Sequence, residues 1–211
     1  MTLEVRLAHL NLAYLQSDSP LVHNEIGMVI KDIEDEIRSR TNKTLGKANV
    51  EKCAKAILKA ASELSQEMFH KSNIIDGIQY FSDGHRILRL ENPIDAEVYE
   101  FHEGQKPFDF ESMFTQLNDN CDKVILFNRA KYLGDYKAFK AKTKAKKIIY
   151  SFGEGLPCVN AHFLADFCNI GDIKEIKWNK TNYPLGGKLN DIEFLLLPIN
   201  AAGEFEGFKA I

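Results

Sequence analysis

The stretch that decides the fold runs from Phe81 to Leu90 and reads FSDGHRILRL. It places an acid, a glycine, a histidine and an arginine between two apolar runs. Asp-Gly is a turn-forming pair, so we predict two strands joined by a tight corner at Asp83-Gly84. Successive side chains on a strand point to opposite faces, so His85 and Arg86 diverge. This pattern favours a corner that shapes a surface over a catalytic cluster.

The composition is that of a globular protein with a substantial core. The chain has 211 residues, of which 45% are hydrophobic and 27% charged, and its net charge is −3. No apolar stretch reaches the length of a membrane span. Charged residues interrupt the N-terminal segment where a signal peptide needs an apolar run, so we expect a cytoplasmic protein. The four cysteines are too sparse for a disulfide framework and are predicted to be reduced and mostly buried.

Hydrophobic periodicity predicts an α+β protein. Residues 1–48 are expected to form a helical N-terminal extension. Residues 49–211 are expected to form an α+β domain with a mostly antiparallel sheet, helices on one face, and an insertion at about 95–155. The expected helices cover 1–16, 22–39, 49–68, 110–117, 129–147 and 160–169, with a break at Ser17-Asp18-Ser19-Pro20 and a polar joint over 40–48. The expected strands cover 74–81 (interrupted at Asp76-Gly77), 87–90, 97–101, 124–127, 147–152, 173–178 and 192–199.

The sequence offers little support for catalysis. Asp83 and His85 lack a local nucleophile or metal partner. Cys158, His162 and Cys168 are spaced by four and six residues, without the paired pattern of a structural zinc site. The segment from Leu185 to Lys188 (LGGK) does not have the spacing of a phosphate-binding loop and is read as a turn. We therefore predict no catalytic residue, no metal ligand and no cofactor.

A strongly basic segment runs from Arg129 to Lys147. It contains eight basic residues and one acid, Asp135, so it carries +7 and leaves −10 for the rest of the chain. Such a patch can hold a phosphate backbone without reading bases. The residues expected to contact DNA are Lys137, Lys140, Lys144 and Lys147. The alternative, a helix that is basic only for solubility, stays open.

Two segments resemble the bacterial DNA sliding clamp, the beta subunit of the replicative DNA polymerase. Residues 82–87 (SDGHRI) resemble the clamp's Thr-Asp-Gly-His-Arg-Leu segment, with Ser82 in place of Thr and Ile87 in place of Leu. Residues 156–199 resemble the closing unit of a clamp chain. That unit has a "YLLDAL"-like helix, here His162–Phe167, and an apolar-apolar-Met-Pro ending, here within Phe194–Ile199. Clamp chains carry three similar domains, and this chain has material for about one.

The resemblance implies a short, divergent clamp-like protein that is not an enzyme. It implies a docking or processivity factor for DNA replication or repair proteins, which bind through a short hydrophobic peptide motif. The implied peptide-binding pocket is lined by His85, Arg86, Ile87, Leu195, Leu197 and Pro198. Double-stranded DNA would contact the basic helix, and a homo-oligomer fits the family. Two alternatives stay open: a mobile-element regulator that keeps the fold without a ring, and a metal-dependent phosphodiesterase or nuclease that uses Asp83, His85 and further carboxylates.

Overall fold

The computed structural model describes residues 3–16, 20–121, 123–145, 147–180, 183–189, 191–199 and 207–209. The chain divides into two compact units, Met1–Asn49 and Val50–Ile211, and each is described by itself. That the clamp-like domain begins at residue 49 and carries an insertion at about 95–155 stays a proposal.

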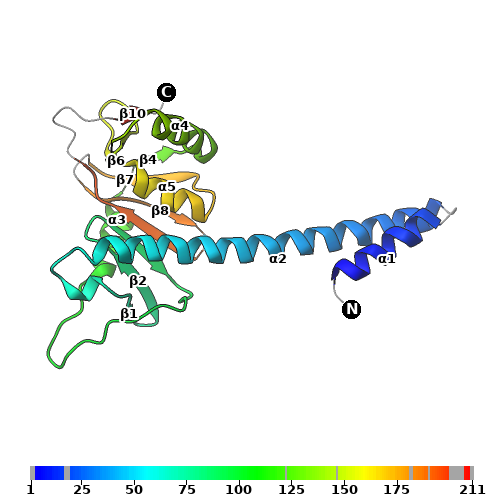
Figure 1. Ribbon diagram of the computed structural model, residues 1–211, viewed down its shortest axis with the longest axis horizontal. Helices are drawn as coiled ribbons and strands as arrows, with labels where there is room; N and C mark the ends of the chain where they lie inside the picture. Colours follow the sequence, from blue (N-terminus) through cyan, green and yellow to red (C-terminus); the bar gives the residue numbers. More distant parts are fainter. Residues whose placement is uncertain are drawn as a thin grey trace. The chain divides into compact units, whose positions relative to one another are not determined.

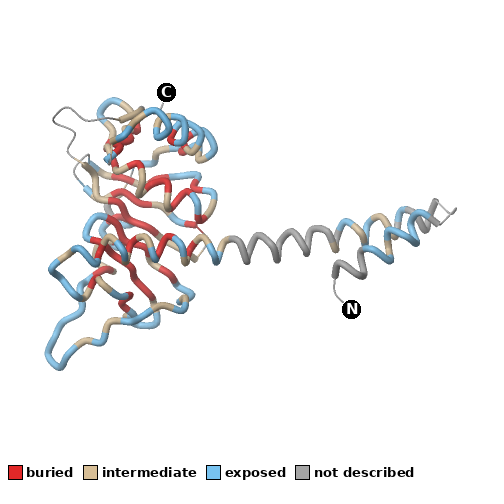
Figure 2. Tube along the Cα trace, viewed as in Figure 1, coloured by how far each residue is buried: buried red, intermediate tan, exposed pale blue. Residues whose placement is uncertain are grey.

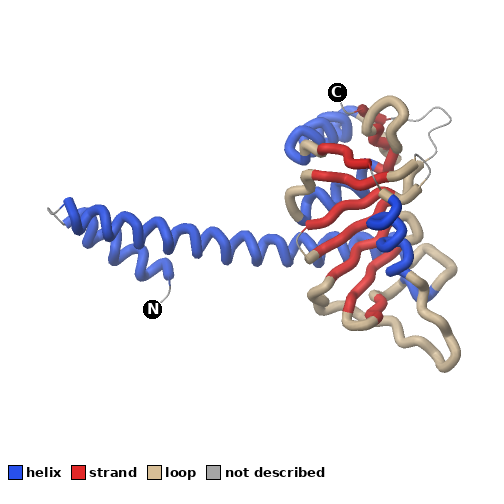
Figure 3. Tube along the Cα trace, turned by 180° about the vertical axis from the view of Figure 1, so that it is seen from behind, coloured by secondary structure: helices blue, strands red, loops and turns tan. Residues whose placement is uncertain are grey.

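The first unit is helical. It contains α1 (Leu3–Gln16) and the N-terminal part of α2 (Pro20–Ala61), which lie alongside each other (Figures 1 and 3). The predicted joint over 40–48 is wrong, because α2 is continuous there. Its Lys, Leu and Ala residues are good helix formers, and the single Gly46 costs only about 1 kcal/mol, which a long helix tolerates. Of the predicted break at Ser17-Asp18-Ser19-Pro20, residues 17–19 lie outside the described residues, and Pro20 is the first residue of α2.

The second unit is built on a seven-stranded sheet with the order β1-β2-β3-β9-β8-β7-β4. All neighbouring strands are antiparallel, so the prediction of an α+β domain with a mostly antiparallel sheet is confirmed. The strands are β1 (Asn73–Ile75), β2 (Ile78–Ser82), β3 (Arg86–Leu90), β4 (Lys123–Leu126), β7 (Glu175–Trp178), β8 (Leu185–Leu189) and β9 (Ile192–Leu196). The expected strand at 97–101 is reduced to a single bridge between Ser72 and Val98.

Helices cover both faces of this sheet. Leu88 and Phe194 pack in one core cluster with residues of the C-terminal part of α2 and of α5 (Ala161–Ile170). Ile87 and Leu195, their neighbours along the strands, pack in a second cluster with α3 (Phe110–Asn120). Figure 1 shows the C-terminal part of α2 and α5 in front of the sheet. Figure 3 views the sheet from the opposite side and shows α3 in front of it. The buried side chains along β3 alternate between the two faces, so each face needs a cover. From the sequence we expected helices on one face only.

A smaller, three-stranded sheet lies beside α4 (Arg129–Lys142). In it, β5 (Ile149–Ser151) pairs antiparallel with β6 (Cys158–Asn160) and parallel with β10 (Gly207–Lys209). The Tyr132 ring of α4 lies 4.8 Å from the ring of Tyr150 and 5.8 Å from that of Phe208. These aromatic contacts join the helix to the sheet. Neither β6 nor β10 was predicted.

The expected turn at Leu185-Gly186-Gly187-Lys188 is wrong, because these residues form β8 in the middle of the large sheet. A Cβ on Gly186 would lie 2.3 Å from the backbone oxygen of Phe194, and one on Gly187 would lie 2.9 Å from the Phe194 ring. The two glycines are therefore explained by close packing around Phe194. A glycine inside a strand often marks such an approach.

Candidate docking surface

The corner between β2 and β3 is organised by the Asp83 side chain. Its Oδ1 accepts hydrogen bonds from the backbone amides of His85 and Arg86, each at 3.0 Å. The Ser82 hydroxyl accepts one from the amide of Gly84 at 3.2 Å. Gly84 has φ +77°, a conformation that glycine adopts without strain. Asp83 thus shapes the corner through its nearest neighbours in the sequence.

Arg86 lies in the interior, where two carboxylates hold it. Its side chain is 3% exposed. Its Nε donates to Oδ2 of Asp83 at 2.8 Å, and its Nη1 donates to Oδ2 of Asp166 at 2.6 Å. Its guanidinium carbon also lies 4.2 Å from the centre of the Phe163 ring. Asp166 and Phe163 both belong to α5, so Arg86 ties the corner to this helix.

Cys53 of α2 borders this ion cluster. Burial raises the pKa of its thiol to about 12; Arg86 opposes the shift, and Asp166 and Asp83 add to it. Cys168 of α5 is likewise buried, and burial raises its pKa to about 12. Cys121 and Cys158 are partly exposed, and none of the four cysteines forms a disulfide. A buried thiol that stays protonated reacts slowly.

We expect Cys53 to resist alkylation and to make the protein less stable at high pH. Its thiol stays protonated in the folded chain and ionises near pH 9 in the unfolded chain, so the unfolded state loses protons first. By pH 10 this lowers the free energy of unfolding by about 1.4 kcal/mol relative to pH 8. Urea unfolding of the wild type and of Cys53→Ala between pH 8 and 10 measures the difference. The prediction would be contradicted if the free energy of unfolding fell equally with pH in the wild type and in Cys53→Ala. Alkylation of Cys53 as fast as that of Cys121 would also contradict it.

The two segments that the sequence analysis assigned to one pocket are neighbours in the large sheet. β3 pairs with β9, with Ile87 opposite Leu195. Beyond the end of β9, the amide of Leu197 donates to the carbonyl oxygen of His85 at 2.9 Å, and the amide of Ile199 donates to that of Cys158 at 2.7 Å. These two bonds hold the segment 197–199 beside the corner.

The six predicted pocket residues differ in accessibility. Arg86 is bound to α5, whereas Ile87 and Leu195 are buried beside Phe114 and Leu117 of α3, on the other face of the sheet. His85 is exposed, and Leu197 and Pro198 are half-buried. The accessible part of the predicted pocket is therefore its outer edge, His85, Leu197 and Pro198.

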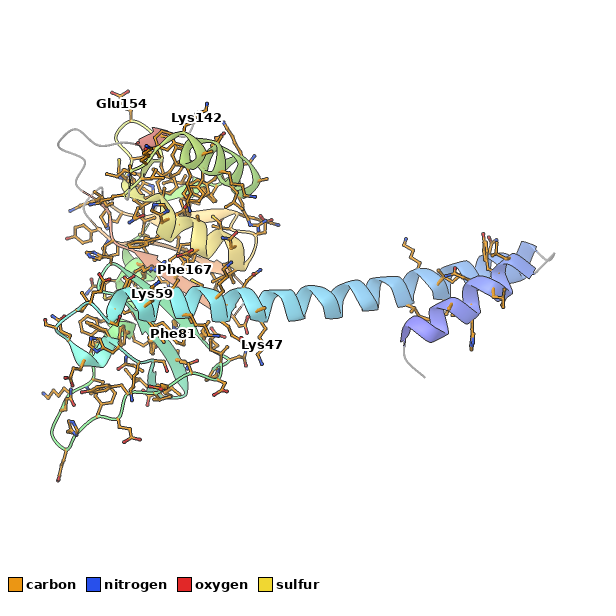
Figure 4. The ribbon with its side chains drawn as sticks, in the orientation of Figure 1. Lys47, Lys59, Phe81, Lys142, Glu154 and Phe167 are labelled. Carbon is orange, nitrogen blue, oxygen red and sulfur yellow. The ribbon has the colours of Figure 1, made fainter. Side chains whose placement is uncertain are left out.

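Phe163 adds a residue that the sequence analysis did not assign to the site. It is half-buried, and its ring lies 6.4 Å from the His85 ring in a stacked orientation. The clue was present, since Phe163 belongs to the helix that resembles the clamp's "YLLDAL" helix. We call His85, Phe163, Leu197 and Pro198 the corner surface. It combines two rings with apolar side chains. Phe81 and Phe167, labelled in Figure 4, belong to the core cluster against which Phe163 packs.

The basic segment is shorter as a helix than predicted. Asn128 caps α4 by accepting from the amide of Lys131 at 3.0 Å, and the helix ends at Lys142. Lys137 and Lys140 lie on α4, whereas Lys144 and Lys147 follow it in the connection to β5. All four are exposed. Figure 2 shows the outer side of α4 as mostly exposed, so its lysines are accessible to a large partner.

The acids near His85 are already used as partners of a cation. Asp83 and Asp166 both form ion pairs with Arg86, so each carboxylate already has a partner within the protein. Within the described part of the chain, no three His, Cys, Asp or Glu side chains are grouped so that they could hold a metal ion. No described helix is long and apolar enough to cross a membrane.

Comparison with solved structures finds DNA polymerase III beta subunits, the family that the corner resembles in sequence. A putative beta subunit from Eubacterium rectale is 14% identical, with 71% of this chain and 63% of that chain covered and a TM-score of 0.47. The Caulobacter crescentus protein is 11% identical, with 68% and 62% covered and a TM-score of 0.48. The Helicobacter pylori beta clamp, solved with a DNA ligase peptide, is 15% identical, with 58% and 40% covered and a TM-score of 0.35.

These matches are similarities of structure alone, each with a TM-score below 0.5. The chain spans less than two thirds of the length of each of these three proteins. No family model matches the sequence, and neither does any curated protein. The function of this chain therefore has to be inferred from its own residues.

Proposed function

We propose that this chain is a non-catalytic, sliding-clamp-like docking protein for DNA replication or repair proteins. Its partner would present a short peptide with hydrophobic anchors to the corner surface. The observation that carries the proposal is that the sheet brings together the two clamp-like segments, Asp83–Arg86 and Leu195–Pro198. The hydrogen bond between Leu197 and His85 joins them directly.

The chemistry of the corner surface suits such a peptide. Leu197 and Pro198 offer apolar contact area, and Phe163 and His85 offer ring faces on which an aromatic or aliphatic anchor can pack. Arg86 is buried and bound to α5, the helix that carries Phe163, so it fixes this part of the surface. Ile87 and Leu195 are buried on the other face of the sheet, against α3. Backbone hydrogen bonds and the ion cluster hold its parts in place. A preformed surface of this kind lowers the entropic cost of binding.

A DNA ligase peptide is a concrete probe, because the Helicobacter pylori clamp was solved with one. We expect the labelled peptide to bind the wild type, and Leu197→Ala and Phe163→Ala each to weaken binding about tenfold or more, as truncated anchors in an interface do. Fluorescence anisotropy measures the dissociation constants. Val124→Ala is the matched control, because Val124 is also an exposed apolar side chain but lies on β4, the far edge strand.

If Leu197→Ala and Phe163→Ala bound the peptide as tightly as Val124→Ala does, the corner surface would be the wrong site. If the wild type bound neither this peptide nor any peptide from a replication or repair protein, the docking role itself would be wrong. Circular dichroism of each variant separates a lost contact from a lost fold. Cleavage of DNA that depends on a divalent metal would instead favour the nuclease alternative.

We further propose that the exposed lysines of the basic segment contact the DNA backbone. Binding of this kind weakens steeply with salt, with a slope of about −0.9 in log K against log salt concentration for each phosphate contact. We expect Lys137→Ala with Lys140→Ala to make this slope shallower by about 1–2 for a duplex of any sequence. Lys59→Ala is the control, since Lys59 is exposed on α2. An unchanged slope would mean that these lysines serve only solubility.

A further inference from the structure

The first unit carries apolar side chains on two different stripes of α1. Leu10 and Tyr14 belong to one stripe. Leu10 is half-buried, and a Cβ on Gly27 of α2 would lie 3.7 Å from the Tyr14 ring. This stripe accounts for the packing of α1 along α2 in Figures 1 and 3.

The second stripe consists of Ala8, Leu12 and Leu15, and all three are exposed. Leu12 is 55% exposed and Leu15 79%. Their spacing of four and then three residues is that of the core positions in a coiled coil. Met28 and Val29 of α2 are also exposed, at 63% and 45%. Among the described side chains of this hairpin, these apolar residues are uncovered, whereas a helical bundle buries such residues in its core.

We propose that this stripe is covered by the same stripe of a second copy of the chain, so that two helical hairpins form a four-helix bundle. A self-complementary patch is what a two-fold dimer requires, because each copy supplies the surface that the other needs. The packing of α1 on α2 leaves Leu12 and Leu15 free to act as the core of this second seam. α1 has only 14 residues, a length at which a helix depends on packing.

The charge of α1 argues against other partners. Its only residues charged at neutral pH are Glu4 and Arg6, which cancel, so two α1 helices can meet without repulsion. Nucleic acid and anionic membrane surfaces both select for a basic face, which α1 lacks. The proposal goes beyond peptide docking and does not depend on it, since it uses no residue of the second unit.

The test is the mass of the full chain in solution. Sedimentation velocity over about 1–100 µM should show a species of twice the 24.0 kDa chain mass for the wild type. Leu12→Glu with Leu15→Glu should sediment as a monomer. His9→Glu with Ala13→Glu adds the same two charges to α1 between the two stripes, at positions that are also exposed, and should remain a dimer.

A wild type that is monomeric over the whole range would overturn the proposal, and so would a dimer that survives both leucine substitutions. Equal disruption by the His9 and Ala13 pair would also overturn it, because the stripe would then have no special role. The two glutamates could act by unfolding α1. Leu12→Ala with Leu15→Ala tests the stripe without this effect, since alanine is the best helix former. This variant should weaken the dimer about a hundredfold or more while its helix content stays unchanged.

Discussion

Replacing Arg86 with alanine is expected to lower the free energy of unfolding by about 3–5 kcal/mol, because it leaves buried carboxylate charge without a partner. Asp83 is 2% exposed, and Arg86 is its charge partner at 2.8 Å. Asp166, which is 35% exposed, can partly recover its hydration, so most of the cost falls on Asp83. The guanidinium's contact with the Phe163 ring is lost as well. Urea unfolding at neutral pH measures the change.

Lys188→Ala is the control for this experiment. Lys188 also has acidic partners, Glu91 and Glu193, but its ammonium lies 3.6 Å from each and its side chain is 57% exposed. Exposed pairs of this kind contribute about 0–1 kcal/mol. If Arg86→Ala cost no more than Lys188→Ala, Arg86 would not be the buried link between the corner and α5. It would then be free to act as the polar rim of the peptide pocket.

Replacing Gly186 with alanine is expected to cost about 3 kcal/mol or more. The new Cβ would lie 2.3 Å from the backbone oxygen of Phe194, and less than 3 Å from methyl carbons of Leu117 and Leu195. The backbone oxygen belongs to the partner strand β9 and cannot move without breaking the pairing, so the strain is not relieved by a rotamer change. The shift of the urea midpoint, or of Tm, measures the loss.

At Gly134 in α4, we expect the same substitution not to lower the stability. Nothing lies within 4 Å of the position of its Cβ, and alanine is favoured over glycine in a helix by about 1 kcal/mol. We therefore expect this variant to be as stable as the wild type or slightly more stable. A Gly186→Ala protein with an unchanged Tm would mean that β8 does not approach β9 as closely as the structure shows.

Much of the fold could be predicted from local patterns. The corner was predicted correctly, since Asp-Gly favours a turn and the carboxylate of Asp83 binds amides two and three residues away. The helix around Phe110 and the strand around Ile192 followed from apolar periodicity. β8 was missed because two adjacent glycines suggest a turn when their neighbours in space are unknown. The supposed joint over 40–48 was wrong because polarity was taken as a break, although the Arg, Lys, Leu and Ala residues of this segment form helix readily.

The corner surface was also predictable only in part. The resemblance identified the segments 82–87 and 194–199, and the pairing of β3 with β9 shows that they lie together. Which of their side chains reach the surface depends on the helices that cover each face. α3 buries Ile87 and Leu195, and α5 draws Arg86 inward. Phe163 joins the corner surface through its stacking on His85, a contact between residues 78 positions apart in the sequence.

The amino-acid order alone determined the corner, the alternation of the strands and the basic character of residues 129–147, since these depend on neighbours along the chain. Only the tertiary structure decided that Arg86 points inward, that Gly186 lies in a strand, and that Phe163 lies beside His85. The reason is physical: burial, charge pairing and close packing depend on which distant residues come together, and Asp166 lies 80 positions from Arg86. Those contacts exist only once the sheet and its helices have assembled.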